Sequence, residues 1–216
     1  MMREAPLRFI TFEGSEGAGK STQTRRLETR LRALGQPVLL VREPGGTPLG
    51  ERLRRLIKGS SPELAICAES ELLLFLASRA QLVRQTILPA LRENAWVLAD
   101  RFSDSTFAYQ GGGRGLPQPL LRSFNELVCA GLSPGLTFLL DVSSPVGRTR
   151  IAKRTRESAE GDRIEKEPPD FFERVRDAYH EIARREAGRV RVIDANRSEE
   201  EVAAEIWEVV SRVFGL

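Results

Sequence analysis

The sequence predicts an α/β fold with three layers, in which helices cover both faces of a mainly parallel sheet. Three observations indicate this fold. Short apolar segments recur along the chain, helical patterns separate them, and the first apolar segment ends in a glycine-rich turn. Parallel strands need a long crossover connection, which is usually a helix, so the alternation is typical of a parallel sheet. A chain of 216 residues, 41% hydrophobic and 29% charged, suits one compact domain spanning residues 1–216.

Five segments are expected to form the strands, because each is short, apolar and bounded by turns or helical patterns. They are residues 7–13, 38–41, 96–100, 136–142 and 190–195.

The expected helices follow from apolar residues at helical spacing. Residues 20–34 form the first and Gly35 ends it, 68–88 form a long apolar helix, and 170–185 form an amphipathic one. Ser198 and Glu201 have the spacing of a capping box, which predicts where the last helix begins. Residues 43–48, 111–119 and 154–169 are expected to be irregular. The charged segment is long for a loop, so we expect a short mobile lid at about residues 150–168.

Composition narrows the classes of function. No apolar run approaches the roughly 20 residues that cross a bilayer, and the first residues lack a signal-peptide pattern, so we expect a cytoplasmic protein with no membrane partner. Cys67 and Cys129 are solitary, which suggests neither a zinc site nor a disulfide framework. His180 is the only histidine, so a Ser-His triad is disfavoured. Of the 33 basic residues only four are lysines; arginine suits phosphate recognition, although a compositional bias explains the excess equally well.

The segment EGSEGAGKST is the most informative motif. Gly14, Gly19, Lys20 and Ser21 satisfy the pattern GxxxxGK[ST], after an expected strand and before an expected helix. Backbone N–H groups of such a loop surround phosphates, the lysine reaches the β and γ phosphates, and the hydroxyl ligates Mg²⁺. The motif predicts a P-loop NTPase fold and an ATP site formed by Gly14, Ser15, Glu16, Gly17, Ala18, Gly19, Lys20, Ser21 and Thr22.

The other signatures of P-loop proteins are missing from the chain. It contains neither the NKxD and DxxG patterns of GTPases nor the LSGGQ pattern of transport ATPases. A small kinase with a second, acceptor site is therefore favoured.

Two pairs of residues are candidates for that acceptor site. Phe75 and Arg79 are four residues apart on an expected helix, so the phenyl ring and the guanidinium lie on the same face and could bind a base together. By spacing alone, the alternative is favoured that Phe75 packs in the core and that the end of Arg79 lies in solvent. Asp100 and Arg101 end an expected strand, where parallel sheets bind ligands.

Three further motifs carry a resemblance to a known family. REPGGT (residues 42–47), FLASRAQ (75–81) and DRFSDSTFAYQGGGRG (100–115) follow the P-loop in that order. Together they resemble the thymidylate kinases of the bacterial type, a branch of the P-loop nucleoside monophosphate kinases. The resemblance extends from FITFEG to the final IDA and its helix. It implies transfer of the γ-phosphate of ATP to dTMP with Mg²⁺, and it implies a homodimer. The apolar residues Leu72, Leu73 and Leu76 could form the dimer interface, but packing in the core of one chain explains them equally well.

The resemblance also assigns roles within the acceptor site. Phe75 would stack on thymine and Arg79 would hydrogen-bond it, while Ser105 and Gln110 would approach the base. Arg42 and Arg101 would hold the acceptor phosphate, and Asp100 would act on Mg²⁺ or its waters. Glu16 would contact the sugar 3'-hydroxyl, and Tyr109 would crowd the place of a 2'-hydroxyl.

An arginine is expected to stabilise the charge on the transferring phosphoryl group. In the eukaryotic branch of the family it lies in the P-loop, where this chain has Gly17. The resemblance to the bacterial branch therefore implies lid arginines: Arg154 first, then Arg150 and Arg163.

Other functions stay open from the sequence alone. The acceptor is expected to be dTMP, but dUMP, UMP or CMP are alternatives. Outside kinases, the alternatives are a P-loop ATPase that acts as a switch and an arginine-rich nucleic-acid binder. The net charge of only +3 argues against a nucleic-acid partner.

Overall fold

The computed structural model describes residues 6–59, 65–157 and 163–216, without the side chains of residues 144, 148 and 153–157. Within these residues the sheet has five strands, all parallel, in the order β2-β3-β1-β4-β5. The strands are β1 (Phe9–Glu13), β2 (Val38–Arg42), β3 (Trp96–Asp100), β4 (Leu136–Asp141) and β5 (Val190–Asp194). The predicted α/β fold is confirmed, and the sheet has no antiparallel member in the described part of the chain.

The helices are α1 (Lys20–Ala33), α2 (Pro48–Lys58), α3 (Ala68–Leu82), α4 (Leu88–Arg92), α5 (Ser103–Thr106), α6 (Gln118–Cys129), α7 (Ser144–Glu157), α8 (Pro169–Arg185) and α9 (Glu199–Phe214). Two π-helical segments, η1 (Val83–Ile87) and η2 (Phe107–Gly113), and a short 3₁₀ turn, η3 (Ile164–Lys166), join them. The capping box that begins α9 is confirmed, because Ser198 and Glu201 exchange side-chain and backbone hydrogen bonds.

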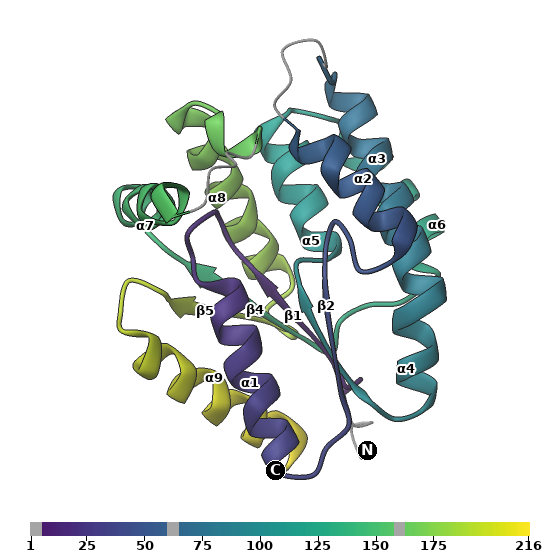
Figure 1. The fold of residues 1–216 in the computed structure, drawn as a ribbon, viewed down its shortest axis with the longest axis vertical. Coiled ribbons are helices and arrows are strands. Elements are labelled where there is room, and N and C mark those ends of the chain that lie inside the picture. The colour runs from purple at the N-terminus through teal and green to yellow at the C-terminus, as the bar shows by residue number, and fades with distance from the viewer. Residues whose placement is uncertain (1–5, 60–64, 158–162) are drawn as a thin grey trace.

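Helices lie on both faces of the sheet (Figure 1). Successive side chains of a strand point to opposite faces, so each strand serves two cores. Ile10 and Phe12 of β1 pack in one core with residues of α1 and α9. Phe9, on the other face, packs with Leu82 and Ile87 at the end of α3 and in η1. This two-sided burial explains why β1, β3 and β4 are mainly apolar.

The long apolar helix extends beyond its predicted end. The predicted helix ends at Leu88, directly before Pro89, a residue that has no N–H and whose ring excludes the carbonyl one turn earlier. The chain instead passes through the π-helical segment η1 and continues as α4, with Pro89 in the first turn of that helix.

All three segments expected to be irregular are partly helical. Pro48 begins α2, residues 111–113 complete η2, and residues 118–119 begin α6. In the charged segment, residues 154–157 belong to α7, 164–166 form η3, and Pro169 begins α8. In η2, a Cβ atom on Gly113 would lie 2.5 Å from the ring of Phe171 in α8. The glycines there allow η2 and α8 to pack closely, which a sequence-based reading as a loop could not reveal.

In the described residues, no helix combines the length and the apolar character needed to span a membrane.

Candidate active site

A large cleft lies at the carboxyl ends of β1, β2 and β3. Its volume is about 1760 Å³, which exceeds the roughly 300–1,000 Å³ of a pocket for one small ligand. Residues 17–22 of the P-loop line one part, and Phe75, Tyr109 and Gln110 line another. The cleft has room for two nucleotides, as a phosphoryl transfer between them requires.

The P-loop wraps from the end of β1 into the N-terminus of α1. Gly17 has a φ of 77°, and a Cβ atom there would meet the carbonyl oxygen of Gly147 at 2.5 Å, so only glycine fits. No side chain caps the start of α1, which leaves its first N–H groups for a bound anion. The ATP-site prediction therefore places its residues on a loop of the expected geometry.

Lys20 points back into this loop. Its Nζ donates to the carbonyl oxygens of Gly14 and Ser15, at 3.1 and 2.8 Å. Burial lowers the pKa of Lys20 to about 8; the positive charge of Arg101 adds to this, while Glu16 and Asp100 oppose it. A nearby phosphate would favour the charged form, so nucleotide binding would raise the pKa of Lys20 and stabilise the ammonium that contacts the phosphate.

Ser21 and Asp100, the two predicted metal ligands, are in contact. The Ser21 hydroxyl donates to a carboxylate oxygen of Asp100, which brings the P-loop to the end of β3. Both supply hard oxygen atoms, the donors that Mg²⁺ prefers. No cluster of three or more His, Cys, Asp or Glu among the described residues could hold a metal by itself. This suits a Mg²⁺ ion that keeps several waters and shares its remaining ligands with a nucleotide's phosphates.

Arg101 connects the two parts of the cleft. Its Nη1 donates to the Gly14 carbonyl at 3.0 Å, and its Nη2 donates to Glu16 at 2.6 Å and to the Tyr109 hydroxyl at 2.9 Å. The guanidinium also lies over the Tyr109 ring, 4.8 Å from its centroid. The structure thus brings together three residues that the sequence assigned to phosphate and sugar recognition.

Arg79 lines the cleft together with Phe75, but its guanidinium is already hydrogen-bonded to other protein groups. Its side chain is only 1% exposed and forms an ion pair with Glu43 at 2.6 Å. The remaining donors go to the Thr106 hydroxyl, the Asn125 side chain and the Phe102 carbonyl, at 2.7, 2.6 and 3.0 Å. Burial is the largest single influence and lowers the pKa of Arg79, but the charge of Glu43, its hydrogen bond and further negative groups together outweigh burial, and the pKa is raised. All five N–H groups have protein partners, so a bond to a base would need one to be released or shared.

The other predicted acceptor residues also line the cleft. Arg42 is about half exposed and pairs with Glu51 at 3.1 Å. Ser105 donates to a buried carboxylate, and Gln110 donates to Glu71 at 2.9 Å. Arg42 is thus the most accessible cation of the predicted acceptor set.

The lid arginines occupy different places. Arg150, from α7, reaches the P-loop, with its Nη1 3.4 Å from the Gly17 carbonyl and 3.0 Å from that of Ala195. The side chain of Arg154 lies outside the described residues. Arg163 donates to Glu71 at 2.5 Å and to the Ile57 carbonyl at 3.2 Å, so it ties the start of η3 to α2 and α3.

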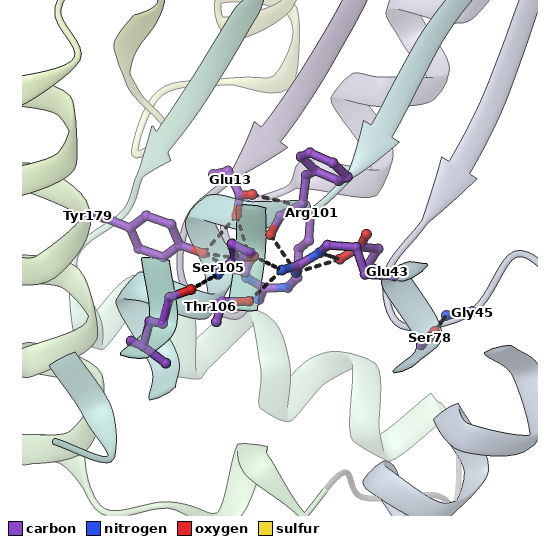
Figure 2. A network of polar contacts seen from close by, with 12 residues as sticks. Glu13, Glu43, Gly45, Ser78, Arg101, Ser105, Thr106 and Tyr179 are labelled. Atoms are coloured by element: carbon purple, nitrogen blue, oxygen red, sulfur yellow. Dashed lines mark hydrogen bonds and ion pairs between the residues drawn. The ribbon is translucent and has the colours of Figure 1, made fainter. Parts of the chain in front are cut away.

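The sequence reasoning missed two residues at the centre of the site, Glu13 and Tyr179. Figure 2 shows both beside Arg101 and Ser105, although they come from β1 and α8. Burial, followed by repulsion from Asp104, raises the pKa of Glu13 to about 7. A carboxylate that ends an otherwise apolar strand was a visible signal for Glu13, but nothing in the sequence linked it to Tyr179.

Comparisons with known proteins agree with this geometry. The family profile described as thymidylate kinase matches residues 12–206. The thymidylate kinase of Deinococcus radiodurans is 50% identical over 203 residues, covering 94% of this chain and 96% of its own length. That of Nitrosospira multiformis is 46% identical over 210 residues, covering 96% and 98%.

A solved structure gives the same result. The crystal structure of thymidylate kinase from Ehrlichia chaffeensis matches with a TM-score of 0.74 and 35% identity, covering 94% of this chain and 97% of the other. The family resemblance found in the motifs is confirmed over nearly the whole chain, and the chain belongs to the thymidylate kinase family.

Proposed function

We propose that this protein transfers the γ-phosphate of ATP to dTMP and forms ADP and dTDP. One observation supports this most directly: Arg101 joins a P-loop to a second recognition surface within one continuous cleft. An ATPase switch needs no such second surface. The family to which the chain belongs phosphorylates dTMP, which favours this acceptor over dUMP, UMP or CMP.

The reaction is a direct in-line displacement. An oxygen of the dTMP phosphate forms a bond to the γ-phosphorus while the bond from that phosphorus to the bridging oxygen of ADP breaks. The attacking oxygen is already an anion at neutral pH, so the site must reduce repulsion and fix geometry rather than remove a proton.

The chain's own residues supply most of these effects. Lys20 and the N–H groups at the start of α1 hold the β and γ phosphates, and Arg101 with Arg42 holds the acceptor phosphate. Arg154 and Arg150 add positive charge near the transferring group. Mg²⁺, held through Ser21 and Asp100, would neutralise charge on the phosphate oxygens.

The acceptor nucleoside is held by the opposite part of the cleft. Phe75 offers its ring to the base, while Ser105, Gln110 and Arg79 provide polar groups. Tyr109 presents a buried ring and a hydroxyl fixed by Arg101, so it restricts the sugar. Deoxyribose preference follows from that restriction.

We also propose that the protein acts in the cytoplasm as a homodimer. On α3, Leu72 and Leu76 are buried within the chain, but Leu73 is 54% exposed, and Leu127 of the neighbouring helix α6 is 68% exposed. These two leucines are the apolar surface offered to a second copy. A molar mass of about 48 kDa in solution, twice the 24.1 kDa of one chain, would support the dimer.

The experiment is ADP release with Mg²⁺-ATP against dTMP, dUMP, UMP, CMP, dGMP and AMP, with a control that lacks an acceptor. Strong preference for dTMP is expected. Preference for another monophosphate would keep the kinase but overturn the acceptor, and equal release without an acceptor would indicate an ATPase.

A matched pair of variants tests the base site. Phe75→Ala is expected to raise the KM for dTMP and leave the KM for ATP unchanged. Phe172→Ala removes a ring that is partly buried against the same core cluster but does not line the cleft, so it should leave both constants unchanged.

A further inference from the structure

Arg101 has a backbone conformation that arginine rarely adopts. Its φ is 73°, in the left-handed region that side chains with a Cβ atom disfavour. Its own N–H still donates to the Phe12 carbonyl at 3.0 Å, so the bend falls directly after the strand pairing ends. Such a conformation persists only where neighbouring contacts enforce it.

Glu13 provides one of these contacts. It is the last residue of β1 and is fully buried. One of its carboxylate oxygens, Oε1, accepts a hydrogen bond from the Phe102 N–H at 2.7 Å. That N–H belongs to the peptide group directly after Arg101, so Glu13 fixes the backbone on the far side of the bend.

The second carboxylate oxygen acts on the other end of Arg101. Oε2 accepts from the Ser105 hydroxyl at 2.6 Å and from the Tyr179 hydroxyl at 2.8 Å. The same two hydroxyl oxygens accept from Nη1 of Arg101, at 3.3 and 3.1 Å. Figure 2 shows Glu13 beside both hydroxyls and Arg101. A single carboxylate therefore constrains both the backbone and the guanidinium of one arginine.

The ionised state of Glu13 determines which groups donate and which accept in these hydrogen bonds. An ionised carboxylate can only accept hydrogen bonds, so the hydrogens of both hydroxyls are directed toward it and their lone pairs face the guanidinium. We propose that Glu13 is a positioning residue for the acceptor phosphate: its carboxylate, as an acceptor of three hydrogen bonds, holds Arg101 in place through Phe102, Ser105 and Tyr179. This rests on the proposed function, because it assumes that Arg101 binds that phosphate.

The charges around Glu13 come from every element that packs near it. Arg101 is the nearest cation and Asp104 the strongest repelling charge. The other charged or titratable groups that interact with it are Lys20 of α1, Arg79 of α3, Tyr109 of η2, Tyr179 of α8 and Arg189 beside β5. Burial is the largest cause that raises the pKa of Glu13 to about 7, so its acceptor character changes within the working pH range.

The variant Glu13→Gln tests the proposal because it keeps the shape and replaces one acceptor oxygen with an NH₂ donor. In one orientation of the amide the NH₂ faces the hydroxyls of Ser105 and Tyr179, and in the other it faces the Phe102 N–H, all of which donate to the carboxylate in the wild type. Either way the contacts to Arg101 are disturbed. The KM for dTMP is expected to rise on the order of tenfold to a hundredfold, and the KM for ATP to change less than about twofold.

A second variant and a control separate positioning from stability. Tyr179→Phe removes one hydroxyl and leaves Glu13 intact, so a smaller rise in the KM for dTMP is expected. Gln36→Ala removes the 3.1 Å hydrogen bond that Trp96 Nε1 donates to Gln36, at the end of β3 opposite to Asp100 and Arg101. It should leave both KM values unchanged.

The pH dependence provides an independent readout. The ratio of kcat/KM for dTMP between the wild type and Glu13→Gln is expected to fall as pH decreases from about 8.5 to about 5.5, because protonation turns one acceptor oxygen of Glu13 into an O–H donor. Titration of the dTMP phosphate affects both proteins and cancels in this ratio.

The outcomes distinguish the two proposals. A ratio that does not change with pH, or equal changes in both KM values, would overturn the role of Glu13 while the wild type still phosphorylates dTMP. A wild type that phosphorylates no dTMP would instead overturn the proposed function.

Discussion

Replacing Glu13 with glutamine is expected to change how the stability of the folded protein depends on pH. Burial, with repulsion from Asp104 next, raises the pKa of Glu13 from 4.5 to about 7, against the lowering effects of Arg101 and two hydroxyls. The folded state therefore binds this proton more tightly than the unfolded state does. Stability from Glu13 is fully present below about pH 4.5 and is lost as pH rises through about 7.

The magnitude follows from the interval between the two pKa values. At about 1.4 kcal/mol per pH unit, the change from 4.5 to about 7 corresponds to about 3 kcal/mol. This is a large part of the roughly 5–15 kcal/mol that stabilises a typical domain. Ionised Glu13 beside Arg101 therefore lowers the free energy of unfolding at neutral pH.

Urea unfolding without ligands, from about pH 4.5 to about pH 8, measures the effect. The free energy of unfolding of the wild type, minus that of Glu13→Gln, is expected to fall by about 3 kcal/mol across this range. Titrating groups that do not interact with Glu13 contribute equally to both proteins. Gln36→Ala, which removes a hydrogen bond from Trp96 at the opposite end of β3, serves as the control, since its difference from the wild type should not vary with pH. Parallel curves for Glu13→Gln would refute the reasoning.

Three further predictions concern catalysis directly. Lys20→Ala is expected to abolish turnover because it removes the cation of the P-loop, and substantial remaining ADP formation would contradict the phosphate role. Arg154→Ala is expected to lower kcat by about 10³-fold or more with little change in either KM; a normal kcat in a steady-state assay would show that another arginine meets the transition-state charge. Removal of Mg²⁺ with a chelator is expected to stop the reaction, and Asp100→Asn to raise the Mg²⁺ concentration needed for half-maximal rate; an unchanged Mg²⁺ titration would exclude Asp100 from the metal site.

The strands and the P-loop could be predicted because their signals are local. Apolar runs end where the strands end, to within two residues, and the loop has its glycines at fixed positions. The helix at 68–88 was predicted too short, because the effect of Pro89 depends on whether the preceding turn can widen. The glycines of η2 were interpreted as a turn, because their packing partner lies on α8, far along the chain.

The polar interior of the site could not be predicted because its partners are distant in sequence. Arg79 contacts Glu43, Thr106 and Asn125, which lie 36, 27 and 46 residues away. The Glu13 contact with Tyr179 spans 166 residues. Motifs identify which residues bear the chemistry, but only the fold shows which of them hold one another in place.

The central claim is the transfer of a phosphoryl group from ATP to dTMP, and following the phosphate itself tests it most directly. The protein would be incubated with Mg²⁺, dTMP and ATP labelled at the γ-phosphate, and the products separated. The label is expected to appear in dTDP, in an amount equal to the ADP formed, and Lys20→Ala is expected to give none. Label released as inorganic phosphate at the same rate with and without dTMP would contradict this claim.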